Sequence, residues 1–203
     1  IARLAAAIAL LTASPSFAAG GAALEHADID PGNVASLQRG ARNFMNYCSG
    51  CHSAKYVRFS TIGRDLELSD EQLGENLMFN AEKTYETINV SMPEAAAGRW
   101  FGSAPPDLSL IGRAKGADYI YSFLKGFYVE PDSPTGVNNT VLAGTSMPHV
   151  LWELQGFRRA VFSEHTEDGV TTTPLEGFET QKEPALDAEG FDEFVRATAN
   201  FLV

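Results

Sequence analysis

Hydrophobic side chains recur at helical spacing just before the first cysteine of the chain. The spacing is that of one helix face, and the positions are Val34, Leu37, Ala41, Phe44, Met45 and Cys48. Asn33 stands directly before this pattern, where a side-chain oxygen can accept a hydrogen bond from a free amide group of the first helical turn. The pattern therefore predicts a helix that begins after Asn33 and brings Cys48 to its C-terminal end.

Helices are also predicted in three later segments. Ser69-Asp-Glu-Gln has the spacing of a capping box and begins a helix that runs to about Leu77. The aromatic-rich segment GADYIYSFLKGFY predicts a helix that ends near Gly126. The last helix is predicted to start near Asp187 and to carry one hydrophobic face. That face consists of Phe191, Phe194, Val195, Thr198 and Phe201.

The segments between these helices have the composition of loops. EPDSPTGVNNT combines Pro, Gly and Asn at the density of a loop. Residues 163–184 mix Thr, Gly and acidic residues around the β-prone GVTTTPL, which predicts either a hairpin excursion or a mobile loop. The expected fold class is therefore mainly α, with long loop excursions and a possible small β hairpin.

The first residues, IARLAAAIALLTASPSFAAGG, hold another hydrophobic run. Arg3 precedes the run and Ser16-Phe17-Ala18 resembles a small-x-small cleavage site, which predicts a partial signal peptide over residues 1–18 and a mature domain over 19–203. The run is too short to span a bilayer, and a buried N-terminal helix is the alternative. Export implies that the mature chain works in an oxidising compartment.

The negative net charge of the chain limits the kinds of molecule that it is expected to bind. The formal net charge is -11, from 15 Lys+Arg and 26 Asp+Glu, and it argues against nucleic acid, whose phosphates would be repelled. Residues 164–193 hold ten acidic residues and a single basic one, Lys182. Such a run is either a solvated face or an acidic surface that attracts a basic electron acceptor.

Both cysteines lie in NYCSGCHSAKY, and a histidine follows the second. A structural zinc site needs about four protein ligands, a thioredoxin-like pair needs a βαβ context that the flanks lack, and a plain disulfide leaves His52 without a role. The motif C-x-x-C-H is typical of c-type haem attachment. In that interpretation Cys48 and Cys51 form thioethers to the two vinyl groups, and His52 holds the iron.

A methionine sulfur is a good sixth ligand for an electron-transfer haem, because it raises the reduction potential. Met45 and Met78 have the apolar neighbours of core residues. Met92 and Met147 each follow Ser and precede Pro in a predicted loop. Position favours Met147, which lies far downstream of the cysteine motif and leaves room for a shell around the haem. Met92, His149 and an open site are the alternatives.

Three separated blocks of the chain resemble the cytochrome c1 family, the haem subunits of cytochrome bc1 complexes. The blocks are SLQRGARNFMNYCSGCHSAKYVRFS, WFGSAPPDLSLIGRAKGADYIYSFLKGFY and NNTVLAGTSMPHVLWELQG, and the resemblance covers about residues 24–203. It implies a cytochrome c-like haem domain with one covalent haem c. The haem-binding residues that it implies are Cys48, Cys51, His52 and Met147.

The same resemblance implies roles for three further residues. Arg113 would be the partner of a haem propionate, with an ordinary surface arginine as the alternative. Pro105 and Pro106 would cover one haem edge with an apolar wall that lacks free N–H groups. The family also implies a C-terminal transmembrane anchor after residue 203, which this sequence does not include.

The resemblance further implies an electron-transfer subunit and not an enzyme on its own. Such a protein relays single electrons from a Rieske iron–sulfur protein to a soluble c-type cytochrome, beside cytochrome b, in a dimeric quinol-oxidising complex. It would lie on the periplasmic side of a bacterial inner membrane. The alternative is a free periplasmic mono-haem protein that acts as a peroxidase or a gas sensor.

Overall fold

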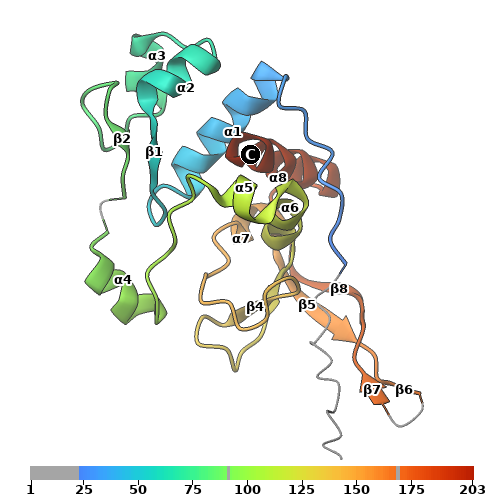
Figure 1. The fold of residues 1–203 in the computed structure, drawn as a ribbon. Coiled ribbons are helices and arrows are strands. Elements are labelled where there is room, and N and C mark those ends of the chain that lie inside the picture. Colours follow the sequence, from blue (N-terminus) through green and yellow to red (C-terminus); the bar gives the residue numbers. More distant parts are fainter. Residues whose placement is uncertain (1–22, 91, 168–169) are drawn as a thin grey trace, which may run out of the picture.

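The computed structural model describes residues 23–90, 92–167 and 170–203, so the predicted signal peptide lies outside the described residues. Short helices and a few short strands surround one pair of longer helices, which confirms the mainly α class (Figure 1). The helices are α1 Val34–Tyr47, α2 Phe59–Asp65, α3 Asp70–Asn76, α4 Glu94–Phe101, α5 Ile111–Lys115, α6 Ala117–Lys125, α7 Trp152–Gln155 and α8 Ala188–Leu202. The strands are β1 Ala54–Arg58, β2 Thr87–Ile88, β3 Phe127–Val129, β4 Val137–Asn139, β5 Phe157–Phe162, β6 His165–Glu167, β7 Val170–Thr172 and β8 Leu175–Lys182.

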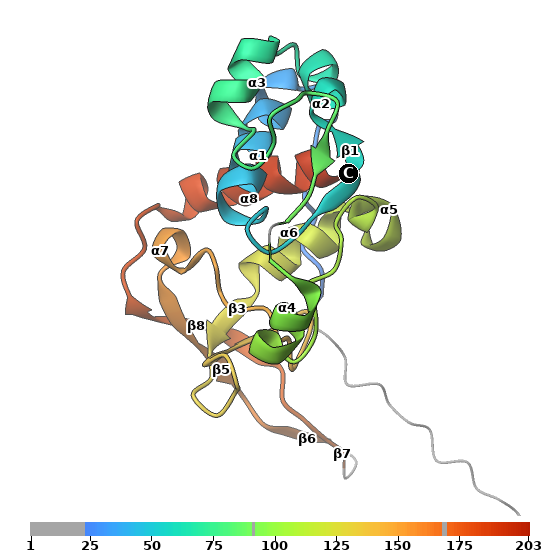
Figure 2. The same ribbon diagram turned by 90° about the vertical axis from the view of Figure 1, so that its left-hand side faces the viewer.

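Helices α1 and α8, from opposite ends of the described chain, cross and pack closely (Figures 1 and 2). The crossing lies at Gly40, which is buried against Ala197 and Phe201 of α8. Buried Asn43 also joins the helices, because its Nδ2 donates to Phe194 O at 3.1 Å and to Thr198 Oγ1 at 3.2 Å. The packed α1–α8 pair forms a frame for the cysteine motif, because the motif begins at the C-terminal end of α1.

Two hydrophobic clusters lie on different parts of this frame. The first cluster is built on α1, β1, α2 and α3, with Phe44, Phe59 and Leu73 fully buried. The second cluster is built on α6, α7 and α8, with Val195 and Ala199 fully buried. The N-terminal part of the described chain therefore has a core of its own, and α8 contributes mainly to the second one.

The predicted helix ends are confirmed by hydrogen bonds. Asn33 Oδ1 accepts from Ser36 N at 3.0 Å and caps α1. Ser69 forms the predicted capping box of α3 with Gln72. Asp187 caps α8, and the predicted face of that helix is buried at Phe191, Val195 and Thr198 and half-buried at its other two members.

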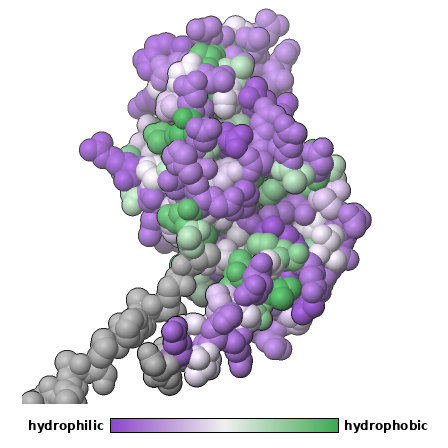
Figure 3. Space-filling model, turned by 90° about the vertical axis from the view of Figure 1, so that its right-hand side faces the viewer, coloured by the Kyte–Doolittle hydropathy of each residue, from purple (hydrophilic) through white to green (hydrophobic). Residues whose placement is uncertain are grey.

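Residues 157–167 and 170–182 form an antiparallel ribbon, which confirms the hairpin prediction for this part of the chain. β5 pairs with β8 and the shorter β6 pairs with β7, and the ribbon projects away from the α1–α8 pair (Figure 1). The face of the molecule in Figure 3 is mainly hydrophilic, with small separate hydrophobic patches. Within the described ranges, none of the helices has the length and apolar character needed to cross a membrane.

Candidate functional site

The cysteine motif folds into a tight turn at the C-terminal end of α1. Cys48 is the C-cap of α1, as the hydrophobic pattern predicted. Its carbonyl oxygen accepts from Cys51 N at 3.0 Å and from His52 N at 2.8 Å. Ser49 Oγ donates to Met45 O at 2.8 Å and ties the turn to the helix. The two thiols and the imidazole therefore come from one short, hydrogen-bonded turn.

The two cysteines are free and differ in burial. Cys48 packs against the first core cluster, whereas Cys51 is less enclosed. Burial and the neighbouring Cys51 raise the pKa of the Cys48 thiol to about 12, and burial raises the pKa of Cys51. Both side chains are therefore neutral thiols at neutral pH, and neither is a primed thiolate of a redox pair.

The ring of His52 is held in one tautomer by the backbone of a distant loop. Its Nδ1 lies 2.7 Å from Pro106 O, and only 8% of the residue is exposed. A carbonyl oxygen can only accept a hydrogen bond, so Nδ1 must carry the proton and the neutral ring keeps its lone pair on Nε2. Burial lowers the pKa of His52 and outweighs the opposite effects of the Pro106 bond and of Asp107. His52 therefore presents an unprotonated Nε2, the form that binds a metal.

Asp107 joins the proline loop to the strand that follows the motif. Its Oδ2 accepts from Lys55 N and its Oδ1 from Ser109 N, each at 2.9 Å. Leu108 N donates to Ser53 O at 2.8 Å and closes the same junction. Sequence reasoning missed this role. The available signal was the Asp-x-Ser spacing after two prolines, which is typical of a side chain that bonds the backbone two residues on.

The four methionines divide into two pairs. Met45 is buried in the first core cluster and Met78 packs against it, which confirms the core prediction for both. Met92 and Met147 are half-buried and belong to neither cluster. Only the second pair is therefore placed to offer a sulfur to a ligand.

Met147 lies on a loop between β4 and α7 that is tied down by two asparagines. Asn139, only 1% exposed, donates to Phe123 O at 2.8 Å and accepts from Val141 N at 2.9 Å. Asn138 Oδ1 accepts from Gly144 N at 2.8 Å, and Gly144 has a φ of 72° that favours glycine. The loop is therefore constrained on the side that precedes Met147.

His149, two residues after Met147, is buried with only 6% of the residue exposed. Burial and the positive charge of Arg158 lower the pKa of His149 to about 4, so its ring is neutral at neutral pH. Among the described residues, neither ring nitrogen makes a hydrogen bond of good geometry, although weak contacts with the Gly156 backbone and the Gln155 side chain oppose the fall of the pKa. The sequence had offered His149 only as an alternative iron ligand.

The remaining predicted residues lie on the chain between the motif and the methionine loop. Pro105 is half-buried and Pro106 exposed, and the Pro106 carbonyl, not its ring, makes the specific contact with His52. Arg113 is exposed on α5. α5 is held against the end of α8 at buried Gly112, where a Cβ would overlap Leu202 O and lie 2.6 Å from Val203 Cα.

The donor set at the turn fits a covalently attached porphyrin iron. Two neutral thiols three residues apart match addition to two vinyl groups, and a neutral imidazole with a free Nε2 matches an axial ligand. The described residues contain no group of three His, Cys, Asp or Glu side chains able to hold a metal ion by themselves. A porphyrin removes that requirement, because it brings four nitrogen ligands of its own.

Comparison with known proteins agrees with this donor set. Residues 64–157 match the Cytochrome C1 family. The chain is 42% identical over 183 residues to cytochrome c1 of Allochromatium vinosum, which covers 90% of this chain and 75% of that protein.

Two further relatives extend the comparison. The chain is 37% identical over 180 residues to a protein of Nitrosomonas europaea described as ammonia monooxygenase gamma subunit, with 89% of this chain and 72% of that protein covered. It is 34% identical over 136 residues to the mitochondrial cytochrome c1 haem protein of Schizosaccharomyces pombe, with 56% of this chain and 44% of that protein covered.

Proposed function

The chain belongs to the cytochrome c1 family, and we propose that it binds one haem c through Cys48, Cys51, His52 and Met147 and uses it to relay single electrons. It is an electron-transfer haem subunit of a bc1 complex, and nothing in the comparisons favours a free peroxidase or gas sensor. The protein performs no bond-making chemistry in this role. Catalysis belongs to the complex, and the chain contributes the relay.

The observation that carries the proposal is the bond between His52 Nδ1 and Pro106 O at 2.7 Å. It fixes both the tautomer and the orientation of the ring, and it makes Nε2 a more basic ligand. His52 is also the next residue after Cys51, so covalent attachment holds the porphyrin beside the ring. A histidine exposed to solvent would have neither a fixed tautomer nor a fixed ring orientation.

Met147 is proposed as the opposite axial ligand. His52 follows a turn anchored to the first core cluster, whereas Leu151, four residues after Met147, is buried in the second. Ligands from the two clusters would approach a flat cofactor from two directions. Val90, two residues before Met92, donates through its N to Ser53 Oγ at 2.9 Å, so the segment that leads to Met92 is attached beside His52 and not to the second cluster.

Bound haem c supplies a one-electron iron couple. The surrounding residues hold, orient and shield it. His52 and Met147 would fill the coordination shell, which prevents other ligands from binding and favours electron transfer. Arg113 is proposed to face a propionate, and Pro105 and Pro106 are proposed to cover one edge of the porphyrin.

The proposed partners follow from family membership. Cytochrome b and a Rieske iron–sulfur protein are the neighbours in the complex, which we expect to be dimeric. Membrane attachment through a C-terminal anchor beyond residue 203, and a location on the periplasmic side of a bacterial inner membrane after export, complete the proposal.

A soluble, basic c-type cytochrome is the proposed electron acceptor, drawn by the acidic residues of 164–193. Several of these carboxylates are already in ion pairs, such as Glu179 with Arg159 at 2.5 Å and Glu193 with Arg39 at 3.1 Å. Exposed Glu164, Glu167 and Glu183 remain to attract a partner. Charge of this kind raises association rates in a salt-dependent way more than it raises affinity.

Attachment is tested first, on protein matured with haem. The pigment should stay with the polypeptide when the sample is extracted with acidified organic solvent, because thioethers survive that treatment. Cys51→Ser and Cys48→Ser variants should each shift the reduced absorption band, since one vinyl group would remain unsaturated. Complete extraction of pigment from the unaltered chain would disprove covalent attachment.

Complex membership is tested separately, by reduction of the haem with quinol. In membranes that contain the whole complex, quinol should reduce this haem, and an inhibitor of quinol oxidation should stop the reaction. The isolated chain should not respond to quinol. Equal reduction of the isolated chain would contradict a relay that depends on partner subunits.

A further inference from the structure

The loop that carries Met147 also carries His149, whose ring packs between two other aromatic rings. We propose that His149 is a positioning residue that holds Met147 against the iron by stacking, an inference that rests on the proposed ligation by Met147. His149 makes its closest described contacts with aromatic rings, one parallel to its own and one edge-on.

His149 lies between rings from two strands. Its ring is parallel to that of Phe127, with an interplanar angle of 5° and 4.9 Å between centroids. On another side it meets Phe157 edge-on, at 74° and 6.5 Å. Phe127 begins β3 and Phe157 begins β5, so the contacts tie the methionine loop to two separate elements. Aromatic pairs of this geometry contribute about 0.5 to 1.5 kcal/mol each beyond the area they bury.

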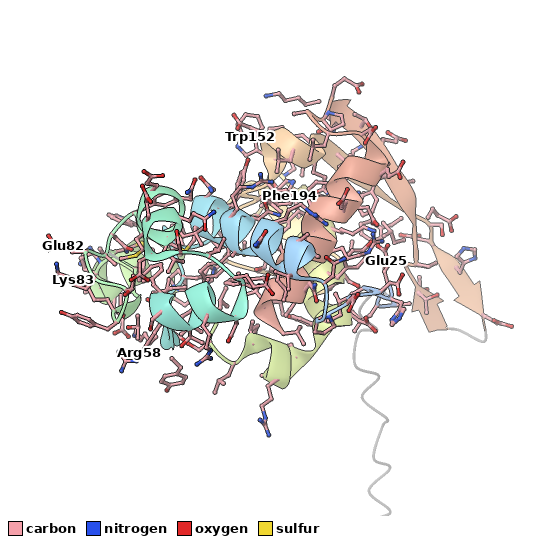
Figure 4. The ribbon with its side chains drawn as sticks, turned by 90° about the horizontal axis from the view of Figure 1, so that it is seen from above. Glu25, Arg58, Glu82, Lys83, Trp152 and Phe194 are labelled. Carbon is pink, nitrogen blue, oxygen red and sulfur yellow. The ribbon has the colours of Figure 1, made fainter. Side chains whose placement is uncertain are left out.

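The stack continues on both sides of this pair. Phe127 meets Phe123 of α6 at 5.3 Å, and Phe157 stacks on Trp152 of α7 at 5.3 Å and 3°. Lys182 of β8 places its Nζ 4.0 Å from the centre of the Trp152 ring. Figure 4 shows Trp152 beside the ribbon strands. The rings that hold His149 are therefore themselves fixed by α6, α7 and the base of the ribbon.

The chain transmits the position of His149 directly to Met147. Pro148 alone separates the two residues, and its ring restricts φ at that position. Between the anchor at Gly144 and the stack at His149, Met147 has one described backbone tie, from its N to Thr145 Oγ1 at 3.3 Å. On its C-terminal side the loop is held by the stack at His149 and, further along, by buried Leu151, so loss of the stack would lengthen the segment around Met147 that has no firm anchor.

The nitrogens of His149 make no hydrogen bond of good geometry among the described residues. Their weak polar contacts with the Gly156 backbone and the Gln155 side chain oppose the fall of its pKa without reversing it, so burial of the ring is explained by its aromatic neighbours. A flat ring without nitrogens should therefore serve equally well. This distinguishes a stacking role from ligation by His149 itself.

The test compares His149→Phe, His149→Leu and Met147→Leu in the haem-loaded protein. We measure the reduction potential, the fraction that binds carbon monoxide, and the sulfur-to-iron charge-transfer band of the oxidised form. His149→Phe should match the unaltered protein. His149→Leu should raise the carbon monoxide-binding fraction at least tenfold and raise the oxidised-to-reduced ratio at a fixed potential. Met147→Leu should abolish the band.

If a His149 variant does not fold, two substitutions on strand β5 provide a matched comparison. Phe157→Leu removes a ring that contacts His149. Phe162→Leu removes a half-exposed ring of β5 that contacts Tyr128 and has no described aromatic contact with His149. Phe157→Leu should change carbon monoxide binding in the same direction as His149→Leu, and Phe162→Leu should not change it.

Each contrary result has a distinct meaning. If Phe157→Leu and a folded His149→Leu bind no more carbon monoxide than the unaltered protein, while Met147→Leu loses the band, the positioning role is wrong and the ligand assignment stands. If His149→Phe raises carbon monoxide binding as much as His149→Leu does, the ring nitrogens are required and the stacking role is wrong. If Met147→Leu keeps the band, both the positioning role and the proposed ligation fail.

Discussion

His52 Nδ1 donates a hydrogen bond to the carbonyl oxygen of Pro106, 54 positions further along the chain, at 2.7 Å. The bond is possible because Asp107 and Leu108 attach the proline loop to the segment 53–55. An axial histidine that donates in this way is more basic, and it stabilises oxidised iron relative to reduced iron. With His52 as the proposed axial ligand, the proline loop would therefore adjust the reduction potential.

Asp107→Ala should raise the reduction potential. The variant loses the bonds to Lys55 N and Ser109 N, so the Pro106 carbonyl is held less firmly and His52 becomes less basic. We expect an increase of ~20 to 60 mV, equal to about a two- to tenfold change in the one-electron ratio. Redox titration measures it. Asp65→Ala, which removes only an exposed carboxylate paired with Arg64, is the control and should leave the potential unchanged. Equal shifts in both variants would exclude a specific role of Asp107.

Met147→Leu should lower the reduction potential, because a thioether stabilises reduced iron. The expected fall is on the order of 100 mV or more, within the roughly 0.8 V range that axial ligands span. Met92→Leu tests the alternative ligand and should leave the potential unchanged. Redox titration of both variants decides between them. The opposite result would assign the sixth position to Met92.

Gly40→Ala should destabilise the protein strongly. A Cβ at residue 40 would overlap the carbonyl oxygen of Ala197 and lie 2.6 Å from Phe201 Cβ, so α1 and α8 would have to separate. Overpacking of this kind costs about 1 to 3 kcal/mol and occasionally more. Denaturant unfolding followed by circular dichroism gives the free energy of unfolding.

Gly74→Ala is the matched control for that substitution. Gly74 lies within α3, and a Cβ there would meet nothing within 4 Å. Alanine is the better helix former, so the change should raise the free energy of unfolding by about 0.5 to 1 kcal/mol. A similar loss in both variants would show that helix propensity, and not the α1–α8 contact, governs the effect.

Asp192 should make the fold sensitive to acid. Burial alone would raise the pKa of Asp192, but hydrogen bonds from Lys125 and Tyr121 and the charge of Arg196 outweigh it and lower the pKa. The unfolded chain therefore binds a proton at Asp192 more readily than the folded chain does. Its contribution to stability is present above the ordinary pKa near 3.8 and is lost as pH falls through the lower folded value.

The contribution of Asp192 is measured by comparing the unfolding free energy of an Asp192→Asn variant with that of the unaltered protein at several pH values. At pH 7 the variant should lose about 1 to 3 kcal/mol of unfolding free energy, because charged hydrogen bonds are replaced by neutral ones. The difference should begin to shrink as pH falls below the ordinary pKa near 3.8 and should vanish only below the lower folded value. A constant difference over the whole range would show that the carboxylate is not the group responsible.

Local patterns predicted four of the eight helices in the described residues, α1, α3, α6 and α8. Asn33, Ser69 and Asp187 cap the helices that their positions predicted, because a cap needs only a side chain and an amide a few residues away. The same holds for Cys48 at the end of α1. The ribbon was predicted only as one of two alternatives, since its pairing joins residues about twenty positions apart.

The stacking of His149 and the role of Asp107 could not be read from local spacing. His149 meets rings from β3 and β5, and nothing in its immediate neighbours distinguishes a ligand from a stacked ring. Asp107 accepts one bond from a neighbour two residues on and another from Lys55, 52 positions earlier. Only the first of these leaves a trace in the sequence.

The sequence by itself determined the chemistry of attachment: two thiols and an imidazole within five consecutive residues specify a covalent haem, because one short turn must place them together. The tertiary structure decided how that imidazole is used. The proton on His52 Nδ1 is fixed by a carbonyl on a loop that only packing brings near, and the rings that contact His149, two residues after Met147, come from separate strands. Contacts between segments far apart in the chain depend on the whole fold, so no local pattern encodes them.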